Sequence, residues 1–156
     1  MLIKNNILSG VKPFFFIAFG VMAYSSAALS EYVPFPGKLK VRLVNIEAAN
    51  VVNVNFETWP GFGRTLRVTL PDVVLPGSSE KPAACELELA NKALDLTTKY
   101  LKSANEISLV DVQMETSADT DVVTAVYTEK GSLVQALQKK GLARSSSIDA
   151  KKPWCK

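Results

Sequence analysis

The sequence contains no histidine, and this absence removes several kinds of chemistry at once. Ser-His-Asp and Cys-His catalysis, proton transfer by imidazole, and metal sites with histidine ligands all need a residue that the chain lacks. The chain also has no G-x-G-x-x-G fingerprint, no P-loop and no cluster of metal-binding cysteines. A cofactor-dependent enzyme therefore has no support, and we expect neither a cofactor nor a protein-bound metal.

Cysteine is scarce as well. Only Cys85 and Cys155 occur, and neither belongs to a C-x-x-C pair. In an oxidising compartment the simplest arrangement is one structural disulfide, tying the C-terminal tail to the start of the central helix. Closing so long a loop is worth about 3–4 kcal/mol in the chain-entropy model. A free reactive thiol and an intermolecular bridge are the alternatives, but no obvious thiolate-stabilising group accompanies either cysteine.

An excess of charge of one sign is also missing. The chain has 18 basic and 15 acidic residues. Lys4 and Lys12 lie in a segment that we expect to be removed, which leaves 16 basic residues (18 less 2) and a net charge of about +1. The protein therefore has no general basic field for nucleic acid, and any such attraction would have to be local.

The first 30 residues have the pattern of a secretory signal peptide. Lys4 and Lys12 precede an apolar run over Phe14–Tyr24, which is followed by small residues. We expect residues 1–28 to be removed after Ala28, with cleavage after Ser30 as the alternative, and the mature protein to be periplasmic or secreted. The apolar run is shorter than the roughly 20 residues of a membrane span, although an uncleaved anchor is the other interpretation. After cleavage no stable membrane span remains.

The mature chain alternates in the manner of a β-rich domain. We expect an extended lead-in over Glu31–Gly37 and then strands over 39–46, 50–56 and 66–70. A loop over 71–84 and a helix over 86–102 follow. The chain then forms strands over 107–114 and 122–127 and a helix from Ser132 to about Lys140. Ser132 can cap the second helix, Gly141 ends it, and residues 145–147 are expected to be loose. This order predicts a mostly β fold with helices (α+β). Its specific form is a five-stranded OB-type barrel with a helix between strands 3 and 4 and a C-terminal helix, in a single domain over 29–156.

Five stretches, taken in order, resemble the staphylococcal nuclease-like domain, especially its small exported bacterial members. They are WPG at Trp59, LRVTL with the loop that ends at Pro76, the helix start at Cys85-Glu86 with Leu89-Ala90, the segment Gly131–Arg144, and KPWC at Lys152–Cys155. The resemblance implies calcium-dependent cleavage of phosphodiesters. Active members use an Asp-Gly-Asp-Thr turn, a strand ending in arginine, a loop aspartate before Pro-Glu, and a second arginine. The carboxylates hold Ca²⁺, the glutamate acts on the attacking water, and the guanidinium groups neutralise the phosphate.

Most of these residues are absent here. Counting from Trp59 and Tyr127 places the family positions on Asn50, Thr69, Val74, Gly77 and Asp121. A shift of one or two residues would bring Arg67 and Asp72 into the strand and loop positions, but no shift supplies the glutamate or the acidic turn. An aspartate at 121 would repel a phosphate. In the alternative interpretation, the polar residues that remain are solvated strand and loop residues. They are Arg64, Arg67, Asp72, Asp119 and Asp121.

The sequence therefore predicts an exported nuclease-like domain that has lost phosphodiesterase activity and binds a nucleic acid or a protein. Trp59, Phe62 and Arg64 are the candidate binding residues, with Phe56 and Tyr127 as further aromatics that could stack on bases. Trp59 and Tyr127 also fit core or hairpin packing. The alternative is an active Ca²⁺-dependent nuclease with Arg67 and Asp72 in shifted roles. Carboxylates and guanidinium groups converging on the loop 71–77 would favour catalysis, and an apolar cluster of Val73, Val74 and Leu75 would oppose it.

Overall fold

The computed structural model describes residues 33–114, 120–147 and 152–155, and side chains from residue 37 onward except that of residue 58. The expected signal peptide with both cleavage sites lies outside these residues, as does Asp119. Within the described part, no helix is both long enough and apolar enough to pass through a bilayer.

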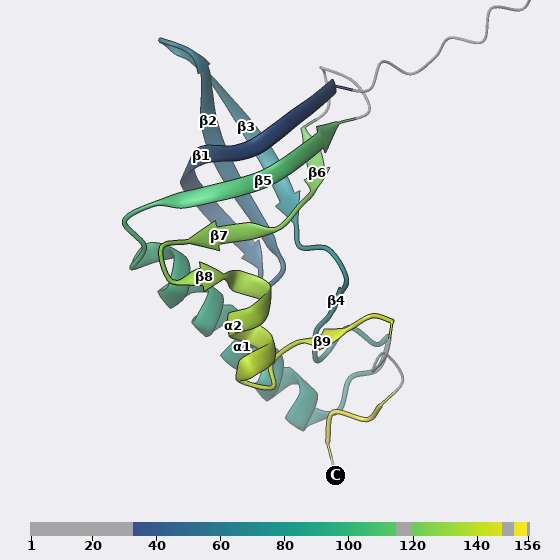
Figure 1. The fold of residues 1–156 in the computed structure, drawn as a ribbon. Helices are drawn as coiled ribbons and strands as arrows, with labels where there is room; N and C mark the ends of the chain where they lie inside the picture. Colours follow the sequence, from purple (N-terminus) through teal and green to yellow (C-terminus); the bar gives the residue numbers. More distant parts are fainter. Residues whose placement is uncertain (1–32, 115–119, 148–151, 156) are drawn as a thin grey trace, which may run out of the picture.

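The main element is a sheet of seven strands that curls into a half-barrel (Figure 1). Its order is β6-β3-β2-β1-β5-β7-β8. The strands are β1 (Val33–Ala48), β2 (Val51–Trp59), β3 (Phe62–Thr69), β5 (Ile107–Met114), β6 (Asp121–Val123), β7 (Val126–Thr128) and β8 (Gly131–Ser132). The predicted mostly β, α+β class is confirmed. The strand count of five is not what the structure has, because one expected strand is divided and a turn adds another.

The divided strand is the one expected over Val122–Tyr127. Its first part, β6, pairs in parallel with β3, and its second part, β7, pairs antiparallel with β5. Thr124 lies between them, where its backbone N–H donates to the Thr69 carbonyl at 3.1 Å and its hydroxyl donates to the Val110 carbonyl at 2.6 Å. Val122, Thr124 and Val126 are all buried. Because the alternation continues through the break, the sequence reads as a single strand.

The N-terminal strand is longer than expected. The first two residues of the predicted lead-in lie outside the described ranges. Its residues 33–37, Pro34 and Pro36 among them, belong to β1, and Val33–Phe35 pair with β5. The register shifts there, and Gly37 has φ +86° and donates its backbone N–H to Asp111 Oδ1 at 2.8 Å. This half of β1 pairs on one side only, which is where a strand tolerates residues that cannot donate a backbone hydrogen bond.

Two helices cover the open side of the curled sheet (Figure 1). α1 spans Ala84–Lys102 and α2 spans Leu133–Lys139, close to the predicted ranges. α1 buries Ala93, Thr97 and Leu101, and the Thr97 hydroxyl donates to the Ala49 carbonyl at 2.9 Å. Ser132 occupies the N-cap position of α2 but makes no capping bond through its side chain, so that part of the prediction is wrong. Gly141 follows the helix with φ +67°, as expected of a helix stop.

A second sheet of two short strands forms where loops were predicted. β4 (Val73–Val74) pairs antiparallel with β9 (Arg144–Ser145). Ser146 adds a backbone hydrogen bond to the Asp72 carbonyl at 3.2 Å. The segment 145–147 is therefore tied to the loop after β3 rather than loose. Strands of two residues carry too little alternation to be found in the sequence.

Candidate functional site

A polar cluster on the outer face of the sheet contains the strongest of the predicted catalytic candidates, Arg67. Its Nε donates to Glu47 Oε2 at 2.8 Å, and its Nη1 donates to Asp121 Oδ1 at 3.3 Å. Asn53 Nδ2 donates to the other oxygen of Glu47 at 2.7 Å. The strand pairing explains the grouping, because Arg67 lies opposite Asn53 on β2 and opposite Asp121 on β6.

The charges of this polar cluster are paired with one another. The pKa of Glu47 is lowered, chiefly by the hydrogen bond from Asn53 and then by that from Arg67. The pKa of Arg67 is raised, first by Glu47 and then by Asp121. One guanidinium thus faces two carboxylates, and all three side chains remain partly open to solvent. A phosphate that approached Arg67 would meet two negative charges, so the cluster is not built to bind an anion.

The loop after β3 does not bring acidic or basic groups together. Asp72 is exposed at the turn into β4, with φ +52°, and Arg67 contacts Glu47 and Asp121 rather than this aspartate. Val73 and Leu75 pack against the core, and Pro76 is buried. Of the two arrangements considered for residues 71–77, the structure therefore has the apolar one. The alternative in which Arg67 and Asp72 take shifted catalytic roles stays a prediction, and the ion pairs of Arg67 with Glu47 and Asp121 lend it no support.

Only one of the family-derived positions joins Arg67, and it is Asp121. The backbone carbonyl of Asn50 accepts a hydrogen bond from the Leu70 N–H at 2.9 Å, and the carbonyl of Thr69 accepts one from the Thr124 N–H. Val74 pairs with Arg144 in the small sheet. Gly77 has φ +76° and lies against α1. These positions have structural roles in turns, pairing and packing, and no group of three or more Cys, Asp or Glu residues suited to a metal occurs in the described ranges.

Sequence reasoning missed Glu47 and Asn53, the two residues that complete the polar cluster. The sequence predicts a strand that ends at residue 46 and so leaves Glu47 in the turn after it, whereas β1 continues to Ala48. In the sequence, Asn53 is an ordinary strand residue. A signal was present in the alternation of β2, since Val52 and Val54 are inward and Asn53 and Asn55 lie on the opposite face. Which residues face Asn53 depends on strand register, and a single sequence does not provide it.

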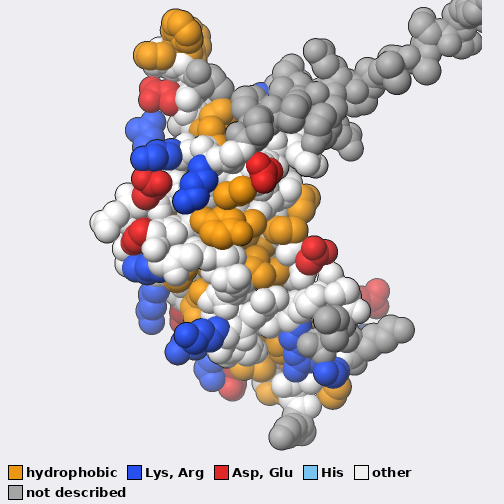
Figure 2. Space-filling view, viewed as in Figure 1, with side chains coloured by type: hydrophobic (Ala, Val, Ile, Leu, Met, Phe, Trp, Pro, Cys, Tyr) orange, Lys and Arg blue, Asp and Glu red, His pale blue; other side chains and the backbone are white. Residues whose placement is uncertain are grey.

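The tip of the β2–β3 hairpin is the second candidate surface. Trp59 and Phe62 are opposite each other in the last pair of the hairpin, and each is 70% exposed. Pro60 and Gly61 form the turn between them; Gly61 has φ +84° and donates its backbone N–H to Glu57 Oε1 at 3.2 Å. The arm projects from the body of the molecule, and its end is apolar (Figures 1 and 2). We define Trp59–Phe62 as the aromatic tip.

The other candidate binding residues lie away from the aromatic tip. Phe56 is buried, with 3% of its surface exposed, so it belongs to the core and is not available for stacking. Arg64 lies across the strands from Phe56 and is half-buried. Tyr127 is half-buried in β7. The interpretation of Trp59 as core packing is wrong, because the tight turn extends the hairpin beyond the part of the sheet that the helices cover.

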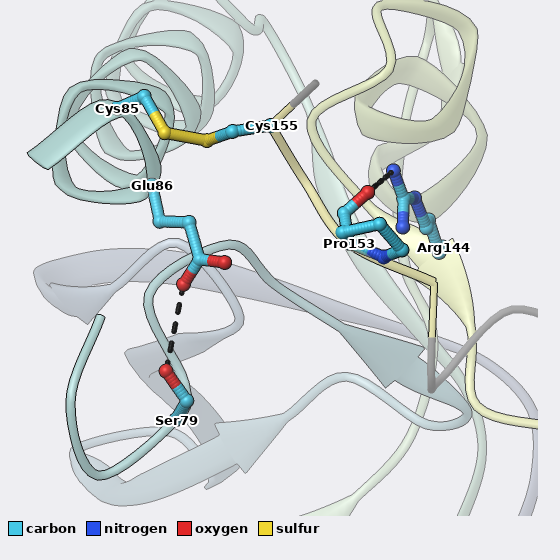
Figure 3. The surroundings of a disulfide bond; sticks show 6 residues. All are labelled: Ser79, Cys85, Glu86, Arg144, Pro153 and Cys155. Atoms are coloured by element: carbon cyan, nitrogen blue, oxygen red, sulfur yellow. Dashed lines mark hydrogen bonds between the residues drawn. A yellow bond between two sulfur atoms is a disulfide. The ribbon is translucent and has the colours of Figure 1, made fainter. Parts of the chain in front are cut away.

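The C-terminal tail is held by a disulfide and an arginine (Figure 3). Cys85 and Cys155 are bonded, with their Cα atoms 6.4 Å apart, so the predicted pairing is confirmed. The Arg144 guanidinium donates to the carbonyls of Lys152 at 2.7 Å and Pro153 at 3.2 Å, and its carbon lies 3.9 Å from the centre of the Trp154 ring. Among the residues with described side chains, no cysteine is left as a reactive thiol.

Comparison with protein-family models and with curated proteins finds no match to this chain. Any assignment of function therefore depends on the geometry of the polar cluster and the aromatic tip.

Proposed function

We propose that the protein is an exported, catalytically inactive nuclease-like domain of the OB type that binds a partner protein through its aromatic tip. The observation that carries the proposal is the pair Trp59 and Phe62, each 70% exposed on either side of the Pro60–Gly61 turn. Side chains of this kind dominate the energy of protein interfaces when they enter a pocket of the partner. A fixed turn also lowers the entropy that binding must overcome.

Loss of phosphodiesterase activity is supported by the polar cluster. Arg67 has its charge engaged by Glu47 and Asp121, and the structure gives Asp72 no part in the cluster. A nuclease of the family type needs guanidinium groups that are free to approach the phosphate and a carboxylate to act on water. Asn50, Val74 and Gly77 cannot supply these groups. The resemblance to the nuclease-like domain then concerns the scaffold alone.

Export is supported by the sequence pattern of residues 1–28 together with the Cys85–Cys155 bond. Disulfides persist in oxidising compartments, and the periplasm and the extracellular medium are of this kind. A protein partner is favoured over a nucleic acid because the tip is apolar and Arg67, at the base of the hairpin, already pairs with Glu47 and Asp121. Binding of a nucleic acid backbone requires unpaired cations in a groove.

The test of lost catalysis uses purified protein incubated with DNA and with RNA, in calcium and in a chelator. We expect no cleavage above that of an Arg67→Ala variant prepared in the same way. Arg42→Ala, which removes an exposed arginine outside the polar cluster, is the matched control. Calcium-dependent cleavage that is lost in Arg67→Ala and kept in Arg42→Ala would show that the domain is an active nuclease and would overturn the first half of the proposal.

The test of partner binding uses the protein immobilised as a ligand for exported proteins of its own source. A species retained by the wild type is purified and its affinity measured against Trp59→Ser, Phe62→Ser and Val123→Ser. Val123 is 64% exposed on β6 and serves as the apolar control. We expect each tip variant to weaken binding by about 30-fold or more and the control by less than about twofold. Tight, salt-sensitive binding of labelled single strands, with no tip-dependent protein, would instead indicate a nucleic-acid module.

A further inference from the structure

A groove between the two helices, remote from the hairpin, has the composition of a ligand site. It has a volume of about 740 Å³ and lies between α1 and the end of α2. On α1 the lining residues Leu89, Lys92, Leu96 and Lys99 follow one face at spacings of three and four. Lys140 and Leu142, which follow the end of α2, complete the walls. Ligand sites for small molecules have volumes of about 300–1,000 Å³.

The groove combines an apolar floor with an excess of positive charge. Leu89, Leu96, Leu142 and the ring of Tyr100 supply the apolar surface. Lys92, Lys99 and Lys140 line it against a single carboxylate, that of Asp95. Among the described residues none of the three lysines forms an ion pair, since the described pairs involve Lys40, Arg67 and Lys130. Two net positive charges beside leucine side chains match a ligand with an apolar body and an anionic head.

A separate observation concerns Tyr100. Its hydroxyl oxygen is buried, and it has no hydrogen-bond partner within the described part of the chain. A buried polar group without a partner costs free energy, and it calls for an explanation such as a missing water or ligand. The ring of Tyr100 lines the groove, whereas its hydroxyl is buried away from solvent, so a ligand in the groove would rest on the ring.

We propose that this groove binds a single-chain amphipathic carboxylate, of the fatty-acid class. The alkyl chain lies along Leu89, Leu96 and Leu142, parallel to α1. The carboxylate accepts hydrogen bonds from the ammonium groups of Lys99, on α1, and Lys140, which directly follows α2. The stretch from residue 89 to residue 103 of α1 is about 21 Å long at 1.5 Å per residue, enough for an extended chain of twelve or more carbons. This site is independent of the aromatic tip and of the partner proposed for it.

The test measures binding of laurate to the purified protein by calorimetry, below the concentration at which laurate forms micelles. Backbone amide shifts locate the bound ligand. We expect saturable binding with shifts on α1 and at residues 140–142, and none at the aromatic tip. The double variant Lys99→Gln/Lys140→Gln should weaken laurate by about tenfold or more, because charge-assisted hydrogen bonds are lost. Lys139→Gln, the exposed neighbour that does not line the groove, is the matched control and should change affinity less than about twofold.

Two further measurements make the outcome decisive. Tyr100→Phe should change laurate affinity less than about twofold and leave the free protein at least as stable as the wild type, because it keeps the ring that lines the groove and removes a buried hydroxyl without a partner. Dodecyltrimethylammonium, which has the same chain with a cationic head, should not bind at the groove. Equal binding of both amphiphiles, or laurate affinity that survives Lys99→Gln/Lys140→Gln, would overturn the proposal. Shifts on the helices with an acidic peptide but not with laurate would do so as well, and would assign the groove to a protein segment.

Discussion

The two ends of the β2–β3 hairpin differ in how their side chains are partnered. At the base, Arg67 meets Glu47, Asn53 and Asp121, and every charge on this part of the sheet face has a partner of the other sign or a hydrogen-bond donor. At the tip, Trp59 and Phe62 leave most of their apolar surface in water. The charges of the polar cluster are paired at the base, whereas the tip exposes its apolar surface. Function on this hairpin is therefore expected at its apolar end.

The two ends also differ in what holds them. The base rests on a packed core, in which Leu66 and Val68 are fully buried. The tip rests on a turn, whose shape is fixed by Pro60 and by the positive φ of Gly61. Changes at the base should therefore alter global stability, and changes at the tip should alter local shape and partner binding. Three substitutions separate these effects, and they are ordered here from the largest expected effect to the smallest.

Leu66→Ala tests whether the base depends on the core. Leu66 is fully buried next to Arg67, and truncation leaves a cavity among the residues of the sheet and helices. We expect a loss of about 2–5 kcal/mol in the free energy of unfolding, measured by denaturant titration. Thr65→Ala, at the exposed neighbouring position, should stay within about 0.5 kcal/mol of the wild type. A loss below 1 kcal/mol for Leu66→Ala would mean that the base is held by its polar cluster instead.

Sequence patterns were sufficient for the parts of the fold with long, regular periods. The predicted range of β5 is confirmed, and that of α1 agrees within two residues, because Leu87, Ala90, Leu94 and Leu101 repeat over about four turns. The reason that β6 and β7 were merged is equally physical. Their inward residues alternate without interruption, while the choice of pairing partner changes from β3 to β5 at Thr124.

For the candidate site, sequence reasoning identifies residue types but not the residues that contact them. Arg67 and Asp121 were recognised as candidates, but their contact depends on parallel pairing across 54 positions of sequence. Glu47 lay beyond the expected end of its strand. The exposure of Trp59 could not be read either, since an aromatic residue before a Pro-Gly turn packs inward or projects according to how far the hairpin extends past the core. Long-range register decides all three cases, and a single sequence does not specify it.

Gly61→Val tests the rigidity of the aromatic tip. Residue 61 has φ +84°, and the space around a side chain there is empty, so the cost comes from the backbone alone. A β-branched residue in this region is expected to cost about 1–2 kcal/mol. Gly61→Asn should recover part of this loss, because asparagine adopts positive φ more easily. Thermal unfolding measures both variants. A Val variant as stable as the wild type would mean that the turn relaxes freely and that the tip is not preorganised.

Glu47→Gln gives the smallest effect and is the sharpest test of the base. The pKa of Glu47 is lowered in the folded protein, first by Asn53 and then by Arg67, so its carboxylate contributes stability that is fully present above the unfolded pKa of about 4.3. That contribution is lost as the pH falls through the lowered folded value. The variant should therefore unfold at a slightly lower temperature than the wild type at pH 7, and the difference should shrink as the pH falls below about 4.3 and disappear once the wild-type carboxylate is protonated.

The same difference in unfolding temperature should also depend on salt concentration. Glu47 and Arg67 are both partly open to solvent, so about 1 M salt should also reduce the difference at pH 7. Glu80→Gln removes a carboxylate of an exposed loop outside the polar cluster and is the control for net charge. If Glu47→Gln and Glu80→Gln behaved alike at every pH, Arg67 would not be held by Glu47 in solution. The guanidinium would then be available to an anion, and the base rather than the tip would again be the end of the hairpin to test for binding.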